Sequence, residues 1–306
     1  MPGGEERILR RRIRTVRETQ KITRAMELIA ASRIARAQQA IAAAKPYTDR
    51  MEEVVAELAA TPEAAGHWIF TGGGDRPLVV VLGADRGLSG AFNVSVTRAA
   101  EALLHELAAG GAEPAVIGVG RKIVSYFNFR ERSMAAALEG ITARPAFEDA
   151  QAVAQAVSEQ VSTGTVSEIY MVSTRFSSVG SQRVDSHRLV PLERPEREAT
   201  TVFEFEPDPD EILDRLLPRW VEAEVYLAML ESAASFHVAQ QRAMKAATDN
   251  ADELIKTLRR VMNRARQDSI TTEIMEIVGG AEALRQGSPD AGSSGRPNIY
   301  VFPEAS

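Results

Sequence analysis

The residues best placed to do chemistry form a glycine-rich turn, Gly83-Ala84-Asp85-Arg86-Gly87-Leu88-Ser89-Gly90, directly after an apolar run. In α/β proteins a turn of this kind, between a strand and a helix, can hold a phosphate group. A P-loop would end in Gly-Lys followed by Ser or Thr, but Ser89-Gly90-Ala91 supplies no lysine. The G-x-S-x-G elbow of hydrolases is also missing. We therefore interpret the turn as one that lets a helix pack onto a sheet, with phosphate binding as the open alternative.

The other candidates for chemistry are four histidines, and the chain has no cysteine. We expect His67 in a loop, His105 in a helix, His187 on an edge strand and His237 in a seam between helices. The sequence indicates no Asp or Ser partner for any of them, and isolated histidines of this kind are mostly surface or packing residues. The absence of cysteine excludes a thiolate metal site and a cysteine nucleophile. The sequence thus predicts no catalytic residue, no metal site and no cofactor.

The N-terminal part of the chain is basic although the whole chain is acidic. The 306 residues carry 36 Lys and Arg against 42 Asp and Glu, for a net charge of −6. The first fifty residues contain a run of arginines: Arg7, Arg10, Arg11, Arg12, Arg14 and Arg17. This run fits a solvated helix end and a docking surface for acidic protein groups equally well. Nucleic acid is not an expected partner, because no aromatic side chains interleave with the arginines.

The sequence also predicts a soluble protein that is not secreted. No apolar run approaches the roughly 18–20 residues that a membrane-spanning helix needs. The N-terminal charges are not followed by the apolar region of a signal peptide.

Two very long helices are predicted at the ends of the chain. Residues 5–58 lack internal glycine, contain only Pro46 as a possible bend, and are rich in good helix formers. After Asp208-Pro209, a helix start signal, and Pro218, a restart or kink, neither glycine nor proline occurs before Gly279. Such helices are far longer than ordinary globular ones and are not stable alone. Because they stand at opposite ends of the chain, we expect them to pair antiparallel.

Both helices show the alternating three- and four-residue spacing of a two-stranded coiled coil. In the first helix the seam positions are Ile13, Val16, Gln20, Thr23, Glu27, Ala30, Ile34, Ala37, Ile41 and Ala44. In the second they are Leu230, Ala234, His237, Gln241, Met244, Thr248, Ala251, Ile255, Leu258, Met262, Ala265, Ser269, Thr272 and Glu276. A second apolar set, Ile22, Met26 and Ile29, lies off the seam and is expected to face something other than the partner helix.

Between the helices the pattern changes to strands alternating with helices, which is typical of an α/β sheet. Strands are predicted at 77–83, 115–119, 168–174 and, at an edge, 183–192; helices at 91–109, 121–129 and 148–161. The predicted fold is therefore a long antiparallel two-helix coiled coil with a central Rossmann-like α/β domain. We expect a division into helix 5–60, domain 76–195, helix 208–285 and a tail, 286–306, that its composition predicts to be disordered. The connection 60–76 is expected to be a loop.

Five sequence blocks, spread over both helices and the sheet, carry a resemblance to a known family. They begin at Thr19 (TQKITRAMELIAASR), Ala84 (ADRGLSGAFN), Leu230 (LESAAS), Ala243 (AMKAATDNA) and Arg264 (RARQDSIT, continuing to IVGGA). From about residue 5 to residue 285 the chain resembles, in order, the gamma subunit of bacterial F-type ATP synthases. The alternative from the patterns alone is a non-enzymatic coiled-coil scaffold with an α/β head; an α/β enzyme with helical arms fits less well because catalytic groups are missing.

The resemblance implies a rotor shaft that does no bond chemistry itself. Such a coiled coil stands inside a ring of three alpha and three beta subunits, with the α/β domain near the epsilon subunit and the membrane c-ring. Ion flow turns the c-ring, the shaft turns with it, and the beta subunits make or hydrolyse ATP. This implies a peripheral protein at the cytoplasmic face of the bacterial membrane, attached only through the c-ring.

The resemblance also implies partner contacts at matching positions. Met26, with Arg24 and Arg33 as countercharge, would lie close to an acidic lever segment of beta. Arg266 and Gln267, with Thr271 one turn beyond, match a pair that contacts a loop of alpha and beta.

A third contact set lies before the second long helix. Phe203, Phe205 and Glu206 match an aromatic-x-aromatic-Glu string near the c-ring loops.

Overall fold

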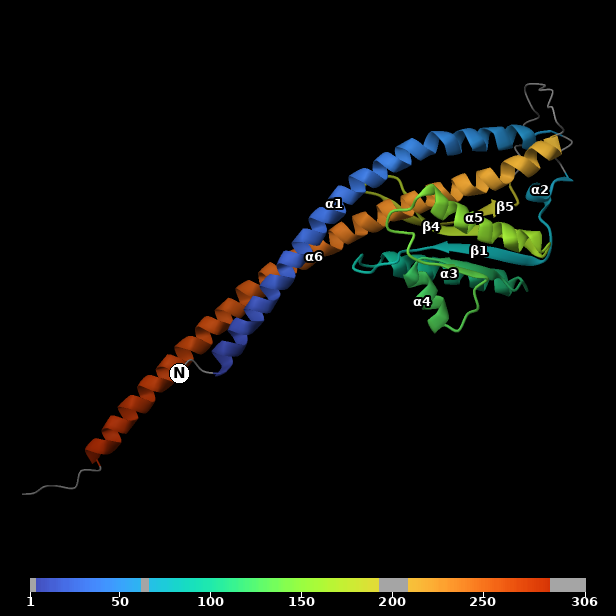
Figure 1. Ribbon diagram of the computed structural model, residues 1–306. Coiled ribbons are helices and arrows are strands. Elements are labelled where there is room, and N and C mark those ends of the chain that lie inside the picture. The colour runs from blue at the N-terminus through green and yellow to red at the C-terminus, as the bar shows by residue number, and fades with distance from the viewer. Residues whose placement is uncertain (1–3, 62–65, 193–208, 287–306) are drawn as a thin grey trace, which may run out of the picture. The chain divides into compact units, whose positions relative to one another are not determined.

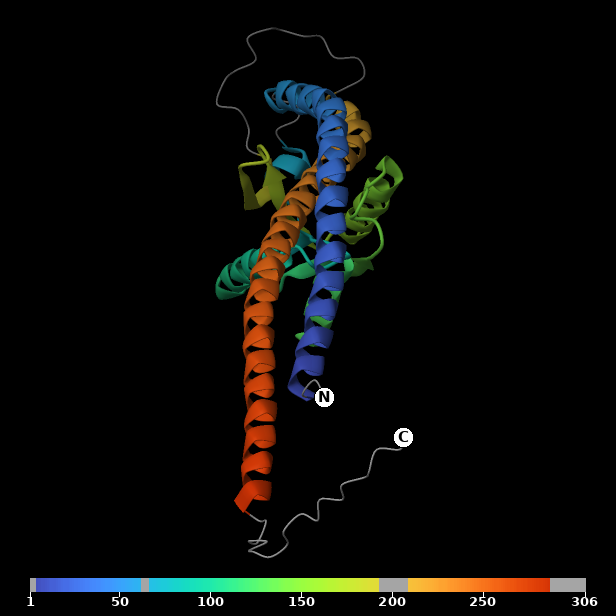
Figure 2. The same ribbon diagram turned by 90° about the vertical axis from the view of Figure 1, so that its left-hand side faces the viewer.

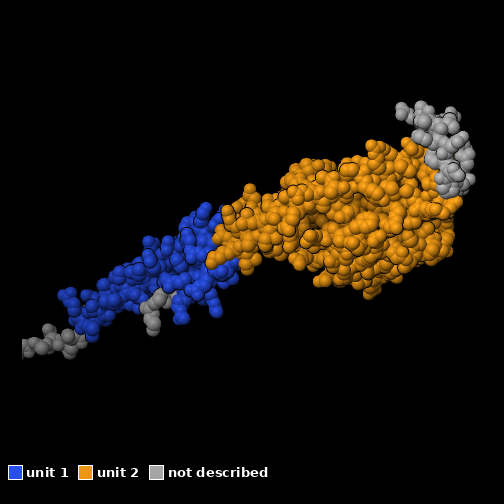
Figure 3. Space-filling model, turned by 45° about the horizontal axis from the view of Figure 1, so that its top comes forward, with its two compact units in different colours: residues 1–19, 250–306 blue, residues 20–249 orange. Residues whose placement is uncertain are grey.

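The computed structural model describes residues 4–61, 66–192 and 209–286. The chain divides into two compact units: one formed by residues 1–19 with 250–306, the other by residues 20–249 (Figure 3). The expected positions Phe203, Phe205 and Glu206, and the tail 287–306, lie outside the described residues. None of the helices in the described ranges has a stretch both long and apolar enough to span a bilayer.

The larger unit contains a five-stranded sheet in the order β3-β2-β1-β4-β5. The strands β1 to β4 pair in parallel, and β5 pairs antiparallel with β4 at the edge, as predicted for this segment. In the centre, Val80 of β1 lies opposite Ile117 of β2 and Met171 of β4. The strands span β1 Arg76–Leu82, β2 Ala115–Val119, β3 Ala136–Leu138, β4 Val166–Phe176 and β5 Gln182–Val190.

Alternation along β1 explains why both faces of the sheet are covered (Figure 1). Val79 and Val81 pack against one layer of helices, α3 (Phe92–Ala109) and α4 (Arg121–Phe129). Leu78, Val80 and Leu82 point to the other face, where α5 (Phe147–Ser162) and the long helices cover them. A continuous apolar run is what a strand buried on both faces requires. The Rossmann-like α/β fold predicted from the sequence is therefore confirmed.

Two helices, α1 (Gly4–Ala59) and α6 (Pro209–Gln286), account for the ends of the described chain. At 1.5 Å per residue they measure about 84 Å and about 117 Å. In the larger unit they lie side by side (Figures 1 and 2). They run antiparallel, because Thr23 of α1 hydrogen-bonds Thr248 of α6 over 2.8 Å, whereas Val55, later in α1, lies beside Trp220, earlier in α6. The predicted antiparallel pairing is thus confirmed.

Each long helix continues through a proline, Pro46 in α1 and Pro218 in α6. A proline in a helix interior costs about 3 kcal/mol because it removes one hydrogen bond and clashes with the preceding turn. After Pro46, the side chains Met51, Val55 and Leu58 are all buried in the core beneath the sheet. This burial offsets the cost, so α1 does not end at Pro46.

The predicted seam is confirmed over most of its length. Every seam position from Ile13 to Ala44 in α1, and from Leu230 to Ser269 in α6, is buried or half-buried. The prediction is wrong for Thr272 and Glu276, which are both exposed. In the described part of the smaller unit, α1 begins at Gly4, beside the groove lined by Ser269 and Thr272. The part of α6 that follows Thr272 therefore has no described helix packed against it.

Two short elements were not predicted. The stretch 60–76, expected to be a loop, contains a helical turn, α2 (Trp68–Thr71), which His67 caps by accepting a hydrogen bond from Ile69 N. The strand β3 has three residues, too few for alternation to show in the sequence. Both elements depend on neighbours: β3 pairs with β2, and His67 Nε2 lies 3.1 Å from Asp214 of α6.

We expect Gly120→Ala to lower the free energy of unfolding by about 3 kcal/mol, the sum of backbone strain and overpacking. Gly120 has a φ of +97°, and a Cβ there would lie 2.9 Å from the carbonyl oxygen of Gly83. Gly111 has a φ of +87° but open space around it, so Gly111→Ala serves as the control with backbone strain alone. Urea unfolding, followed by the fluorescence of Trp68 and Trp220, measures the free energy of unfolding of both variants. Equal losses of stability in the two variants would exclude a steric contribution at Gly120.

Candidate functional site

The carboxylate of Asp85 occupies the place where an α/β protein would bind a phosphate. Its Oδ1 accepts hydrogen bonds from the backbone N–H of Arg121 (3.0 Å) and of Gly140 (2.7 Å). Its Oδ2 accepts from the backbone N–H of Thr142 (3.0 Å) and from the Thr142 hydroxyl (2.8 Å). These donors follow the carboxyl ends of β2 and β3, and Arg121 opens α4. The N-terminus of α4 and the loop after β3 thus bind the carboxylate of Asp85 as their anion.

The charge of Asp85 makes this turn unsuitable for a phosphate. Burial opposes ionisation, but the hydrogen bonds from Gly140, Thr142 and Arg121 outweigh it and hold the pKa of Asp85 below its usual value. An ionised carboxylate that fills the anion position repels a second anion. The arrangement supports the interpretation of the turn as a packing feature.

The glycine that opens the turn has a packing role of its own. A Cβ on Gly83 would lie 2.3 Å from Cγ1 of Ile123, a residue of α4. The tightest approach therefore comes from α4, whereas Asn93 of α3, the helix that directly follows the turn, would lie 3.3 Å away through its Oδ1. That detail depends on the crossover connections of the sheet and has no local sequence signal.

The histidines do not form a catalytic site in the described residues. His237 is buried in α6, where its Nε2 lies 3.2 Å from the carbonyl oxygen of Ala143, and burial lowers its pKa. Burial also lowers the pKa of His187, which lies 3.3 Å from Asp185. His67 caps α2, and His105 is exposed on α3. Across the described ranges, no cluster of three or more His, Asp and Glu side chains could hold a metal ion.

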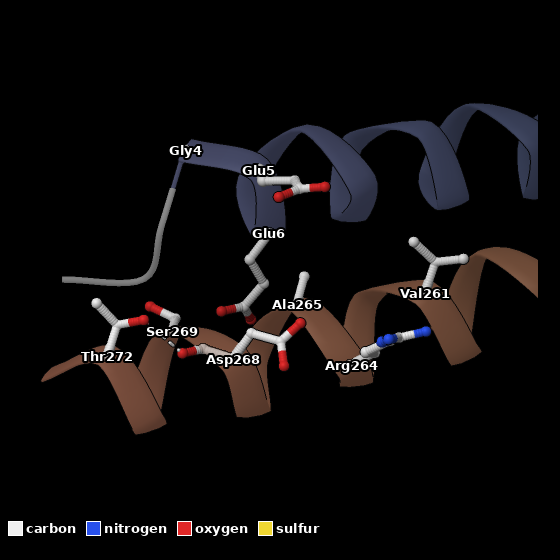
Figure 4. A pocket seen from close by; sticks show the side chains of 9 residues that line it. All are labelled: Gly4, Glu5, Glu6, Val261, Arg264, Ala265, Asp268, Ser269 and Thr272. Carbon is white, nitrogen blue, oxygen red and sulfur yellow. Dashed lines mark hydrogen bonds between the residues drawn. The ribbon is translucent and has the colours of Figure 1, made fainter. Parts of the chain in front are cut away.

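The smaller unit contains an open groove where α1 begins beside α6 (Figure 4). The groove has a volume of about 400 Å³, and Glu6 and Asp268 extend into it from the two helices. Glu6 is mostly buried and accepts a hydrogen bond of 2.6 Å from Arg10. Neighbouring hydroxyls come from Ser269 and Thr272. We interpret the groove as the polar end of the helix pairing.

A second groove in the same unit is basic. Arg10, Arg14 and Arg17 of α1 line it together with Arg259 of α6, and its apolar surface comes from Ile13 and Met262. All four arginines are exposed. Three of the six arginines of the predicted run therefore lie on one side of α1. Arg259 of α6, which the sequence analysis did not connect with the run, lies beside them. Docking of acidic protein groups at this surface stays a prediction.

The first set of expected contact residues lies on α1 in the larger unit. Arg24 is exposed, and Met26 and Arg33 are half-buried. The off-seam residues Ile22 and Ile29 are 60% and 50% exposed, so the predicted second apolar face exists. Basic and apolar side chains therefore share an uncovered surface of α1 in this unit.

The second set lies on α6 in the smaller unit. Arg266, Gln267 and Thr271 are all exposed, and the Thr271 hydroxyl donates to the carbonyl oxygen of Gln267 over 2.9 Å. The side chains of Arg266 and Gln267 are therefore accessible to a partner.

An apolar surface beyond these residues was missed by the sequence analysis. It consists of exposed side chains on α6: Ile270, Ile274, Met275, Ile277, Val278 and Leu284. The positions 270, 274, 277 and 284 keep heptad spacing, but on a different register from the seam that continues to Thr272 and Glu276. A comparison of the two registers would have found this surface. Beyond residue 269, the register of Ile270, Ile274 and Ile277 carries apolar residues, whereas the seam register carries Thr272 and Glu276. Exposed apolar patches of this kind mark protein contacts.

We expect Asp85→Asn to lower the free energy of unfolding by about 2–3 kcal/mol at pH 7, because three backbone donors lose a charged acceptor. Since the pKa of Asp85 is depressed, its contribution is complete above the ordinary carboxyl pKa and is lost as the pH falls below about 4. Urea unfolding at pH 7 and at about pH 2.5 measures the difference in stability between Asp85→Asn and the unmodified chain, which should shrink on acidification.

The control for Asp85→Asn is Glu139→Gln. Glu139 forms an exposed pair with Arg121 over 3.0 Å and should change stability by less than about 1 kcal/mol. A loss at Asp85 no larger than at Glu139, or one that does not depend on pH, would contradict the anchoring role.

Comparison with known proteins identifies the family of this chain. A family model described as ATP synthase matches residues 5–284. The chain is 46% identical to the ATP synthase gamma chain of Parafrankia sp. (strain EAN1pec), covering 94% of this chain and 100% of that one. It is 44% identical to the gamma chain of Thermobifida fusca (strain YX), covering 94% and 98%.

Solved structures share the fold at lower identity. A chain of the Euglena gracilis mitochondrial ATP synthase (OSCP/F1/c-ring) matches with a TM-score of 0.65 at 15% identity, over 97% of this chain and 100% of that one. A chain of the Tetrahymena thermophila central stalk and c-ring matches with a TM-score of 0.59 at 22% identity, over 74% and 99%. With the sequence matches, these findings establish that this chain belongs to the family of ATP synthase gamma chains.

Proposed function

We propose that this chain is the rotor shaft of an F-type ATP synthase, a subunit without a catalytic site of its own. The observation that carries the proposal is the antiparallel pair of long helices whose seam is buried while apolar and basic side chains remain uncovered. Family membership and the occupied anion position at Asp85 support it. Ion-driven rotation of a c-ring turns the shaft, and the shaft drives the beta subunits through the states that bind ADP and phosphate and release ATP.

The parts of the chain divide this work. The helices 5–60 and 208–285 form the shaft, because two paired helices resist bending better than one. The domain 76–195 forms the foot near epsilon and the c-ring. The tail 286–306 is an extension without a role in assembly.

The two exposed contact sets on the long helices face the surrounding ring. Arg24 and Arg33, with Met26, lie against an acidic lever segment of beta, an arrangement supported by the basic and apolar character of that surface of α1. Arg266, Gln267 and Thr271 contact a loop of alpha and beta. Charged pairs at such an interface fix register and orientation more than they add affinity.

The contacts at the foot complete the assembly. Phe203, Phe205 and Glu206 meet the c-ring loops. One copy of the chain serves three alpha and three beta subunits, and the protein is peripheral at the cytoplasmic face of the bacterial membrane, attached through the c-ring.

Coexpression with the alpha and beta subunits of the same source tests this function. Sizing and native mass should show one copy of the chain in an assembly with three of each, and ATPase activity that requires it. A chain that stays alone would contradict the proposal, and a chain that pairs only with itself would favour the scaffold alternative.

We expect Arg266→Glu to reduce the ATPase activity of that assembly about tenfold or more, since a reversed charge meets a partner arranged for a cation. The matched control is Arg215→Glu, on the same helix, where Arg215 is exposed and pairs with Glu211 at 2.5 Å. Initial ATPase rates of purified complexes measure both. Equal activities of the two variants would remove Arg266 from the contact set.

A further inference from the structure

Two neighbouring segments of the long helices carry charge of one sign only. Residues 7–17 of α1 contain six arginines, residues 256–266 of α6 contain four arginines and a lysine, and neither segment contains Asp or Glu. Both segments belong to the smaller unit, and the basic groove described above is lined by residues of both. Like charges on paired helices repel each other. This part of the helix pair is therefore destabilised unless negative charge is supplied.

The chain supplies little of that negative charge itself. Within the part of the chain that the structure describes, Arg10 is the only arginine of the groove with an ion pair, which it forms with Glu6 over 2.6 Å. Arg14, Arg17 and Arg259 are all exposed. Arg17 and Arg259 also have no acidic residue three or four positions away, where a pair within the same helix would form. Three guanidinium groups of the groove are thus available to an anion from outside the chain.

The apolar surface of the groove restricts the kind of anion that fits. The groove has a volume of about 310 Å³, and the buried Ile13 and half-buried Met262 line it together with the arginines. Guanidinium groups bind carboxylates through two parallel hydrogen bonds. A phosphate would also engage the arginines, but it would leave Ile13 and Met262 without an apolar contact. The groove is therefore matched best to a protein segment that carries carboxylates beside an apolar side chain.

We propose that this groove is the docking site for an acidic loop of the subunit ring that surrounds the long helices. The inference rests on the proposed function, because it takes the occupant from that ring. Carboxylates of the loop pair with Arg14, Arg17 and Arg259, and an apolar side chain of the loop packs on Ile13 and Met262. None of the residues in the two contact sets expected on the long helices lines this groove. The charges that weaken the free helix pair thus stabilise it in the assembly.

A triple variant, Arg14→Gln with Arg17→Gln and Arg259→Gln, tests the groove, because the free chain and the assembly should respond with opposite signs. Arg10 is kept, since it pairs with the buried Glu6. In the free chain the variant relieves repulsion, so we expect its Tm to rise by about 1–2 °C. In the assembly with alpha and beta subunits the variant loses attraction, so we expect the chain to dissociate about tenfold faster or more.

Calorimetry of the free chain measures the Tm, and exchange of the bound chain against an excess of nitrogen-15-labelled chain, followed by native mass, measures dissociation. The matched control is a second triple variant, Arg7→Gln with Arg11→Gln and Arg12→Gln. It removes the same charge from exposed positions of α1 that do not line the groove, and its dissociation should change by less than about threefold. Equal acceleration in the two triple variants, or a lower Tm of the free groove variant, would overturn the proposal.

Failure of the docking site and failure of the proposed function give different results. Assembly of the unmodified chain with alpha and beta subunits, together with unchanged dissociation of the groove variant, would overturn the docking site alone. No assembly of the unmodified chain would overturn both. Titration of the free chain with ATP covers the phosphate alternative: binding by the unmodified chain that the groove variant loses would show that the groove takes phosphates, and would overturn the acidic loop.

Discussion

Burial of the seam between α1 and α6 is the interaction on which the other features of this protein depend. Isolated helices are marginal in water even when their composition is favourable, because nucleation is costly and each turn adds little. The seam supplies the missing stabilisation from Ile13 to Ala44 on one helix and from Leu230 to Ser269 on the other. Its apolar residues are interrupted by Thr23 and Thr248, whose hydroxyls satisfy each other at 2.8 Å. Each hydroxyl also bonds a carbonyl of its own helix, that of Gln20 for Thr23 and that of Met244 for Thr248, so the pair adds a polar contact across the seam and leaves no buried hydroxyl unsatisfied.

The α/β domain is joined to the long helices through one continuous core. The face of the sheet that carries Val80 packs on α5 and on both long helices, with Leu58 and Leu213 among the fully buried side chains. At the carboxyl end of the sheet, Asp85 ties the loops after β2 and β3 to the turn after β1. The domain thus uses the edge where related folds bind ligands to hold its own loops. This rigidity suits the role of a foot for the rotor that we propose for the domain.

The polar clusters of the structure stand where helices meet other elements. Glu231 of α6 accepts a hydrogen bond from the backbone N–H of Phe176 of β4 over 3.4 Å. His237 of α6 meets the carbonyl of Ala143 in the loop that Thr142 ties to Asp85. Each contact is partly buried, and each joins segments far apart in the sequence. In an assembly that rotates, such contacts determine which parts of the subunit move as one body.

Composition and periodicity determined the long helices and the α/β class, because heptads and buried strands leave repeating apolar patterns. The antiparallel pairing followed from the places of the two helices at opposite ends of the chain. The resemblance carried by five blocks indicated the gamma chain family, which the comparisons confirm. The sequence did not determine where the seam ends. Thr272 and Glu276 fit the heptad pattern, but both are exposed because α1 does not extend far enough to cover them. Nor did the sequence indicate β3 or the partners of Asp85. These depend on which distant segments meet, and only the packing of helices on the sheet decides that.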